Sequence, residues 1–569
     1  MLFFNFLLKF IYINTRPHRL SVRTLAFRAG KMGSIPIGAT WFMVNPEIDY
    51  LNIARVEDLK RKKEKIFYRC LESLPGFLSL TTIFLAIILS WLRPVAIAIF
   101  IILFDLYWLI KVVYLSFHQV SSFLTMKRNL KINWLEKIKK IPNWEKIYHL
   151  VILPFYKEEK EIIKESLNSL FNSYYPKNKL IVVLSGEERA GEEAKEIAKE
   201  IEREFSGKFF QFLVTIHPKN IEGEIAGKGS NFAWAFKEVK EKIIQPLKIP
   251  SENIIVSNFD IDTKPYPHYF SSLAYHYLTT KNPERASYQP IPIYNNNIWL
   301  APAFSRVVAT SGTFWQMMQQ ERPEQLVTYS SHSLPFKVLE EIHYPSNVVS
   351  DDSRIFWKSY LYYNGDYRVV PLYYPVSMDA VLAKNLFRTI VSQYKQQRRW
   401  AWGVENIPYL IFGFFKNKKI PLFEKIRHSF IIFEGFWSWA TVALLIFFLG
   451  WLPLVLGGAD FNTTLISYNL PRITRNLMTM AILGMIVSAI LSLLILPPKP
   501  KNFGRLKKLS IILQWLLLPL TLIVFGSIPA LEAQIRLLLR KYLGFWSTEK
   551  TRDQKIEVKE SELSPKFEI

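Results

Sequence analysis

The chain has 569 residues, half of them apolar, and 72 Lys and Arg against 48 Asp and Glu give a net charge of +24. Because the basic residues flank long apolar segments, the charge follows the positive-inside rule of membrane proteins, and no nucleic-acid partner is expected. The single cysteine, Cys70, excludes an intrachain disulfide and a cysteine-rich zinc site.

Two apolar runs, residues 74–92 and 95–110, predict a membrane hairpin over residues 74–115. A basic, interfacial segment, residues 1–73, precedes it. Asp105, inside the second run, is either a functional intramembrane acid or, as we favour, a residue near the turn or facing a neighbouring helix.

Strand and helix patterns alternate from about Tyr148, within a domain predicted at residues 146–405. Four apolar runs predict strands, and the segments between them predict amphipathic helices. The strands are expected at residues 150–155, 180–185, 210–216 and from 254, and the helices from 157, over 194–205 and from near 230. This alternation is typical of a parallel sheet with helices on both faces.

The fourth strand ends in Asp260-Ile261-Asp262. Successive strand residues point to opposite faces, so the two acids should point the same way, off the carboxyl end of the sheet where α/β proteins bind ligands. Close carboxylates repel unless a cation lies between them, and hard divalent ions take oxygen ligands together with substrate phosphates. An acidic turn after the strand is the alternative.

A glycine-rich loop at residues 223–231 contains Lys228. Its glycines would let backbone amides approach a phosphate whose charge Lys228 offsets. The spacing is not that of a P-loop, and a flexible loop before a helix cap explains the pattern equally well.

Two further groups of polar residues occur later in the domain. Asp351 and Asp352 precede a predicted helix that begins near Ile355, and they act either in chemistry or only as a helix cap. Gln396 and Arg399-Trp400 share one face of another predicted helix, at i, i+3 and i+4.

Three more apolar segments follow, each long enough to span a membrane. We predict interfacial helices at residues 406–428, transmembrane helices within 429–531, and an amphipathic segment with a charged tail at 532–569. Five spans with a cytoplasmic start would leave the tail outside, whereas Arg536 and Arg540 favour the cytoplasm. Residues 528–543 are therefore either re-entrant or interfacial, or one span is miscounted.

These residues resemble the membrane-embedded family 2 glycosyltransferases, of the cellulose-synthase and hyaluronan-synthase type. The resemblance covers about residues 148–405, flanked by membrane helices. Four elements carry it in the family's order, with a weaker fifth at Ser311-Gly312-Thr313: residues 151–159, Asp260-Ile261-Asp262, the pair Asp351-Asp352 where the family has Glu-Asp, and Gln396-x-x-Arg399-Trp400.

The resemblance implies an α/β GT-A domain, Rossmann-like with a mostly parallel sheet, on the cytoplasmic side of a multi-pass plasma (inner) membrane protein. It implies inverting, metal-dependent sugar transfer from a nucleotide-sugar donor, expected to be a UDP-sugar, to a growing polysaccharide. Single transfer to a lipid acceptor is the nearest alternative. A transporter is disfavoured because only Asp105 is ionisable within the apolar segments.

By the same resemblance, Asp260 and Asp262 hold the donor diphosphate and are the ligands of Mg²⁺ or Mn²⁺. Asp352 is the general base that deprotonates the acceptor hydroxyl, with Asp351 beside it. A positioned carboxylate activates a weakly nucleophilic alcohol, and a divalent ion stabilises the departing diphosphate.

On the acceptor and diphosphate side, the resemblance places residues of the predicted helix and of the weaker fifth element: Gln396, Arg399, Trp400, Gly312 and Thr313. The donor side is expected to include Lys228, Pro154 and an acid after the second strand. The family has Asp at that last position, whereas this chain has Glu187 and Glu188, which leaves the bound nucleotide open.

Overall fold

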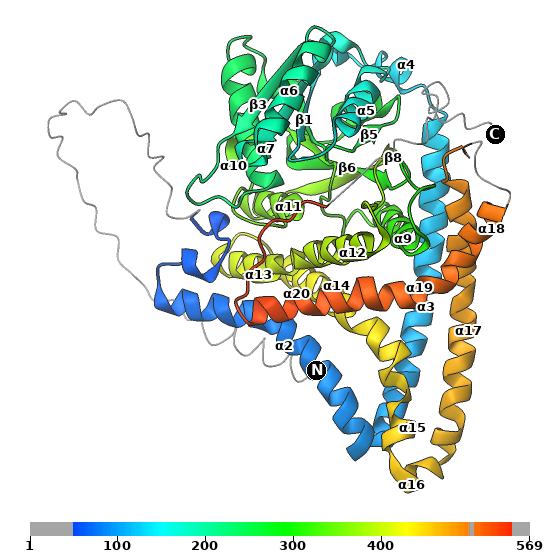
Figure 1. Cartoon of the computed structure of the whole chain (residues 1–569). Helices are drawn as coiled ribbons and strands as arrows, with labels where there is room; N and C mark the ends of the chain where they lie inside the picture. Colours follow the sequence, from blue (N-terminus) through cyan, green and yellow to red (C-terminus); the bar gives the residue numbers. More distant parts are fainter. Residues whose placement is uncertain (1–48, 499, 501–505, 549–569) are drawn as a thin grey trace, which may run out of the picture. The chain divides into compact units, whose positions relative to one another are not determined.

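The computed structural model describes residues 49–498, 500 and 506–548 (Figure 1). All described residues belong to one compact unit. The predictions for residues 1–48 and for the tail from residue 549 lie outside the described residues.

An eight-stranded mixed sheet forms the core of the α/β domain (Figure 1). Its strand order is β3-β2-β1-β4-β7-β6-β8-β5. The strands are β1 (Tyr148–Pro154), β2 (Leu180–Glu187), β3 (Gln211–His217), β4 (Ile254–Asn258), β5 (Lys264–Pro265), β6 (Ala286–Ile293), β7 (Ser333–Pro335) and β8 (Arg368–Ser377).

The first four strands run parallel, as predicted, and each predicted strand occurs within two residues of its expected start. Antiparallel β7 separates them from the second group, in which β6 and β8 are again parallel. The predicted fold class, an α/β domain placed between membrane helices, is confirmed.

Side chains of β1 alternate between two hydrophobic cores, because neighbouring strand residues face opposite sides of the sheet. Leu150 and Ile152 pack in the core that contains α7 and α11. Val151 and Leu153 pack in the core that contains α5, α6 and α8. The helices of the domain are α5 (Lys160–Phe171), α6 (Glu192–Phe205), α7 (Lys228–Val239), α8 (Tyr269–Thr279), α9 (Ala303–Gln320), α10 (Phe336–Ile342), α11 (Asp351–Tyr362) and α12 (Leu386–Ala401).

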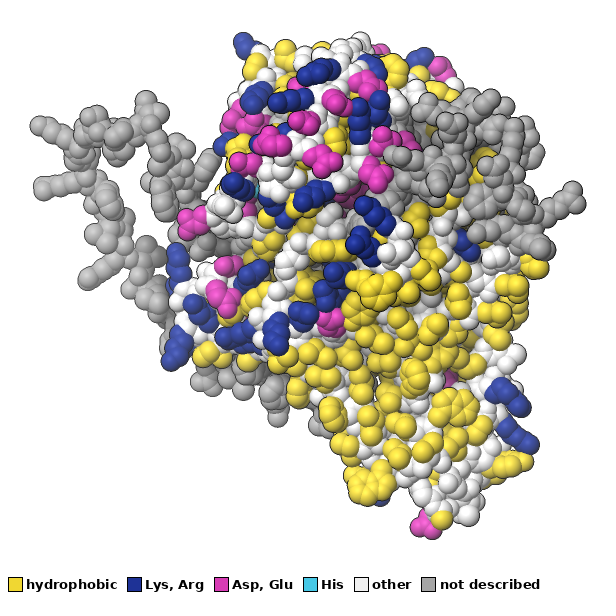
Figure 2. Space-filling view, viewed as in Figure 1, with side chains coloured by type: hydrophobic (Ala, Val, Ile, Leu, Met, Phe, Trp, Pro, Cys, Tyr) yellow, Lys and Arg dark blue, Asp and Glu magenta, His cyan; other side chains and the backbone are white. Residues whose placement is uncertain are grey.

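Within the part of the chain that the structure describes, five helical segments are long and apolar enough to cross a membrane. Figure 2 shows a broad hydrophobic surface over these helices, whereas charged side chains cover the α/β domain. Four are single helices, α2 (Lys62–Leu92), α3 (Pro94–Leu130), α14 (Leu422–Phe447) and α17 (Leu465–Leu494). Helix α2 begins before the predicted hairpin. Helix α3 extends beyond it, because its end continues into the domain and packs on α9 and β8.

The fifth segment, Leu509–Leu538, contacts the α/β domain at both ends. Near its start, the Trp515 ring stacks on Phe314 of α9 with centroids 5.9 Å apart. Near its end, Glu532 accepts a 2.7 Å hydrogen bond from Tyr394 of α12. The segment includes the end of α18 (Leu506–Leu513) together with α19 (Leu518–Thr521) and α20 (Ile528–Leu538), and Figure 1 shows α20 alongside α12.

The segment thus packs against the α/β domain near both of its ends. Whether residues 528–543 are re-entrant or interfacial, or one span is miscounted, stays a prediction. The remaining short helices are α4 (Trp134–Ile138), α13 (Asn406–Lys416), α15 (Leu452–Leu456) and α16 (Gly458–Asn462).

Candidate active site

Asp260 and Asp262 lie in the turn that follows β4, since the strand ends at Asn258. The prediction that both side chains point the same way assumed that the strand continues through Asp262, and the structure does not confirm it, because the exposure of the two side chains differs. The Asp260 side chain is 27% exposed, whereas Asp262 is fully buried and its Oδ2 accepts a 2.8 Å hydrogen bond from the backbone N–H of Asp379. The turn thus leaves the Asp260 side chain partly exposed and buries that of Asp262.

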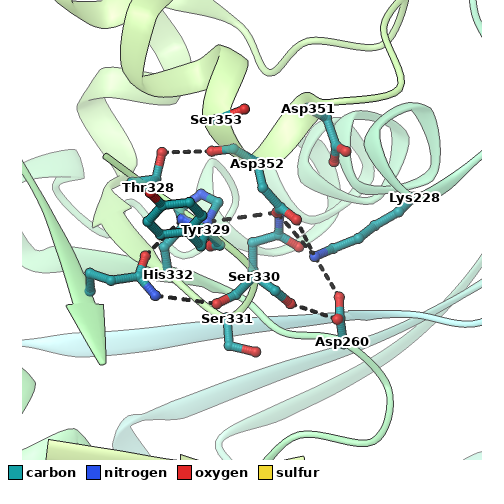
Figure 3. Close-up of polar contacts among 12 residues, drawn as sticks. Lys228, Asp260, Thr328, Tyr329, Ser330, Ser331, His332, Asp351, Asp352 and Ser353 are labelled. Carbon is teal, nitrogen blue, oxygen red and sulfur yellow. Dashed lines mark hydrogen bonds and ion pairs between the residues drawn. The ribbon is translucent and has the colours of Figure 1, made fainter. Parts of the chain in front are cut away.

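Lys228 joins the donor-side acid to the predicted base (Figure 3). Its Nζ lies 2.6 Å from Asp260 Oδ1 and 3.1 Å from Asp352 Oδ1. Burial alone would lower the pKa of Lys228, but the carboxylates of Asp260 and Asp352 raise it above its ordinary value. The charged amine therefore holds together two acids that lie far apart in the sequence.

Asp351 and Asp352 form the first turn of α11, and the residue at the N-cap position is Ser350. The hydroxyl of Tyr344 donates to both acids, at 3.3 Å to Asp351 Oδ2 and 3.4 Å to Asp352 Oδ1. Asp351 is buried, and burial together with the charge of Asp352 raises its pKa. Asp352 is 24% exposed and contacts Lys228, which makes it the accessible carboxylate of the pair.

Helix α12 carries three of the predicted residues, Gln396, Arg399 and Trp400. The guanidinium of Arg399 lies 5.0 Å from the centroid of the Phe545 ring, and its buried Nε has no hydrogen-bond partner among the described residues. Gln396 accepts a 3.2 Å hydrogen bond from Gln393. The ring of Trp400 lies 6.1 Å from that of Tyr294.

Tyr294 connects α12 with the acids. Burial raises the pKa of its hydroxyl, the charges of Asp260 and Asp262 raise it further, and Arg399 opposes this shift. Gly312 of α9 faces its ring, because a Cβ there would lie 3.5 Å from Tyr294 Cε2. Thr313 accepts from the Tyr294 N–H at 3.4 Å. The predicted residues Gly312 and Thr313 thus support Tyr294, and their assignment to the acceptor stays a prediction.

The predicted donor residues Pro154, Glu187 and Glu188 lie at or beyond the ends of β1 and β2. Arg189 Nη2 donates to Glu187 Oε1 at 3.1 Å, and its guanidinium lies 4.5 Å from the Tyr156 ring centroid. Glu188 accepts from the backbone N–H of Lys219 at 3.0 Å. Both glutamates are therefore engaged in local contacts near the expected nucleotide side.

The segment at residues 544–547 crosses the site and was not predicted. A Cβ on Gly227 would lie 2.5 Å from the ring of Phe545, which also contacts Arg399. Lys395 lies 5.1 Å from the Trp546 ring, and Ser547 donates to Glu158 at 3.4 Å. The aromatic pair just before the charged tail was the only signal in the sequence.

Sequence reasoning also missed the partners of the acids. Ser330 donates a 2.5 Å hydrogen bond to Asp260 Oδ2, and Asn258 donates to Asp352 at 3.3 Å. Asn296 Nδ2 donates both to the Asp262 carbonyl, at 3.0 Å, and to Asp379 Oδ1, at 2.9 Å. Asp379 follows β8 as Asp260 follows β4, so an acid after a strand was the available signal.

The residues around Asp262 fit a hard divalent cation, because carboxylate oxygens are the ligands such ions prefer. Among the described residues, no group of three or more His, Cys, Asp or Glu side chains is arranged to hold a metal ion by itself. A bound ion would therefore take further oxygens from a substrate, as Mg²⁺ does from phosphates.

A family model described as glycosyl transferase family group 2 matches residues 255–526, from β4 through the C-terminal apolar helices. The match supports a family 2 glycosyltransferase. The predicted enzyme class, a glycosyltransferase, is confirmed, whereas the cellulose-synthase and hyaluronan-synthase type stays a prediction. A search of curated proteins found no match.

Two solved glycosyltransferases resemble this one at low identity. The first is the mannosyltransferase PcManGT from Pyrobaculum calidifontis in complex with GDP-Man and Mn²⁺, with 17% identity, a TM-score of 0.35, and coverage of 68% of this chain and 97% of that chain. The second is S. aureus TarS 1-349 in complex with UDP-GlcNAc, with 11% identity, a TM-score of 0.33, and coverage of 60% and 90%.

Proposed function

We propose that this glycosyltransferase moves a sugar, with inversion, from a nucleotide-sugar donor to the hydroxyl of a growing polysaccharide at the cytoplasmic face of the plasma membrane. The observation that carries the proposal is the cluster in which Lys228 bridges Asp260 and Asp352. The ammonium group of Lys228 lies between Asp260, the proposed donor-side acid, and the accessible carboxylate of Asp352. This arrangement suits a reaction in which an acceptor hydroxyl attacks a sugar that is bonded to a diphosphate.

In this reaction Asp352 takes the proton of the acceptor hydroxyl. The acceptor oxygen bonds to the anomeric carbon as the bond from that carbon to the diphosphate oxygen breaks, and the leaving diphosphate keeps the electron pair. Lys228 and Arg399 would offset its negative charge, since the first is paired with Asp260 and the charge of the second acts on Asp351. Tyr294 and Trp400 offer aromatic faces on the acceptor side.

Asp262 and Asp260 would hold Mg²⁺ or Mn²⁺ together with the donor diphosphate. The ion supplies charge stabilisation at the leaving group. Pro154, Glu187 and Glu188 would lie toward the nucleoside, for which UDP is our first expectation. Membrane lipids surround the apolar helices.

The cytoplasmic orientation rests on the distribution of charge. Basic residues collect at the ends of the apolar helices nearest the domain, and nucleotide sugars are made in the cytoplasm. A cysteine placed near Glu192 should resist an impermeant external reagent in intact cells. Labelling at that position would overturn the orientation.

A donor screen on the purified protein tests the function. UDP-glucose, UDP-galactose, UDP-N-acetylglucosamine and GDP-mannose are offered with Mn²⁺ or Mg²⁺, and release of the nucleoside diphosphate is measured. Release that requires both metal and Asp352 supports the proposal, and no release from any donor contradicts it. A radiolabelled product of high mass on a size column indicates a polysaccharide, whereas a lipid-extractable product indicates single transfer to a lipid.

A further inference from the structure

A five-residue segment, residues 328–332, touches both acids of the cluster just before β7 (Figure 3). We propose that this segment is a positioning element that keeps Asp260 and Asp352 in register when the donor engages Lys228. The inference rests on the proposed function and goes beyond it, since it concerns residues outside the predicted site.

Two hydroxyl groups of the segment donate hydrogen bonds, one to Asp260 and one to Asp352. Ser330 Oγ donates to Asp260 Oδ2 at 2.5 Å, and Thr328 Oγ1 donates to the backbone carbonyl of Asp352 at 2.6 Å. Thr328 is fully buried. The segment is anchored in turn by Gln289, whose side chain accepts from the Tyr329 N–H at 2.9 Å.

His332 closes one side of the Asp352 carboxylate. Its Nδ1 lies 2.7 Å from the Tyr329 carbonyl, to which it donates, and 3.7 Å from Asp352 Oδ1. Burial lowers the pKa of the imidazole, which favours its neutral form beside the carboxylate.

The contacts of Asp352 are therefore unequal at its two oxygens. Oδ1 is approached by Asn258 at 3.3 Å and Tyr344 at 3.4 Å as well as by His332 and Lys228. Oδ2 has Lys228, at 3.4 Å, as its single hydrogen-bond partner among the described residues. Oδ2 is therefore the oxygen of Asp352 with fewer contacts among the described residues.

The backbone of the segment has an unusual conformation at Ser331, which helps to hold the segment in this arrangement. Ser331 has a φ of 64°, a left-handed conformation that a non-glycine residue adopts at a cost. It is fully buried, and its hydroxyl lies 2.8 Å from that of Thr263. This turn lets Ser330 face Asp260 while His332 faces Asp352.

A second connection is needed because Lys228 has two tasks. In the structure it bridges the acids, whereas a donor diphosphate would compete with them for its charge. The 328–332 segment makes no use of that charge, so its contacts survive donor binding and maintain the distance between donor and base.

The test compares Ser330→Ala, Thr328→Val and the double variant, using the donor turned over fastest in the screen. Ser330→Thr restores a hydroxyl and serves as the rescue variant. Ser251→Ala is the matched control, since Ser251 Oγ also donates to a carboxylate, that of Glu340 at 2.6 Å, away from the site. Thermal unfolding and gel filtration in detergent show that each variant is folded.

We expect each single variant to lower kcat and to raise the donor KM, with kcat/KM reduced about tenfold, because a hydrogen bond to an ionised group is lost or its register disturbed. The loss in the double variant should be at least about threefold smaller than the product of the single losses, since both act through one element. Ser330→Thr should recover most of the rate, and Ser251→Ala should match the wild type.

The inference is overturned if Ser330→Ala changes only KM, Thr328→Val changes only kcat, and the two effects multiply. It is also overturned if both variants match the wild type. These outcomes leave the wild type and its Asp352 dependence intact, so they differ from failure of the proposed function, in which the wild type releases no nucleoside diphosphate or Asp352→Asn keeps the full rate.

Discussion

The two halves of the sheet differ in how far each is determined by local sequence. Strands β1, β2 and β4 are apolar and buried, β3 is a half-buried edge strand, and amphipathic helices join these strands. Strands β6 and β8 contain prolines and a register shift between Gln289 and Ile291, and β7 has three residues. The first half supplies Asp260, whereas the second supplies Ser330 and Asp379, which contact the acids. Local patterns thus locate the acids, and distant pairings supply their partners.

The largest expected effect tests whether the acid pair performs chemistry. Asp352→Asn keeps the shape of the side chain but cannot accept a proton, so we expect transfer to fall about 10²–10⁴-fold with donor affinity nearly unchanged. Nucleoside diphosphate release and donor binding by calorimetry measure the two quantities.

Asp351→Asn is the matched control for that change, because Asp351 is buried and less accessible than its neighbour. It should reduce the rate far less. A rate lost in Asp351→Asn and kept in Asp352→Asn would move the base by one residue, and activity in both would place the base elsewhere.

The sequence was sufficient to predict β1 to β4 and to locate the acids after β4 and the residues on α12, because each belongs to a pattern within about ten residues. It did not predict that Asp260 is partly exposed whereas Asp262 is buried. It was insufficient where strands pair over long distances. Ser333 pairs with Ser257 across 76 residues, and this pairing brings Ser330 to Asp260. No local periodicity encodes such a contact. Phe545 was missed for the same reason, since it reaches Gly227 from the far end of the chain.

The next effect concerns the metal. Asp262→Ala removes a predicted ligand, and we expect apparent affinity for Mn²⁺ to fall by about 10²-fold or more, since even outer partners of a metal site are worth 10–100-fold. The rate of nucleoside diphosphate release is measured as a function of Mn²⁺ concentration at a saturating concentration of the donor. Asp366→Ala, at an exposed acid, is the control. An unchanged Mn²⁺ dependence, or near wild-type turnover in a chelator, would remove Asp262 from the metal site.

A smaller effect tests the segment that crosses the site. Phe545→Ala removes the ring beside Arg399, and a cation–π contact is worth about 1 kcal/mol, so donor kcat/KM should fall about fivefold. Phe171→Ala is the matched control, because Phe171 packs near Lys177 and Lys208 on the surface of α5. Equal rates in Phe545→Ala and wild type would show that the ring contributes nothing to donor use.

The smallest effect is a pH dependence of stability at Asp351. Burial and the charge of Asp352 raise its pKa in the folded state, so the folded protein favours the protonated form. The stabilisation is full below the unfolded pKa of about 4 and is lost as pH rises through the raised folded value. Asp351→Asn stays neutral throughout. It should therefore unfold about 1 °C above the wild type at pH 8, for a difference of about 1 kcal/mol in a chain of this length, and match it at pH 4. Thermal unfolding in detergent at the two pH values measures the gap, and an Asn variant less stable than wild type at pH 8 would show that Asp351 is needed in its charged form.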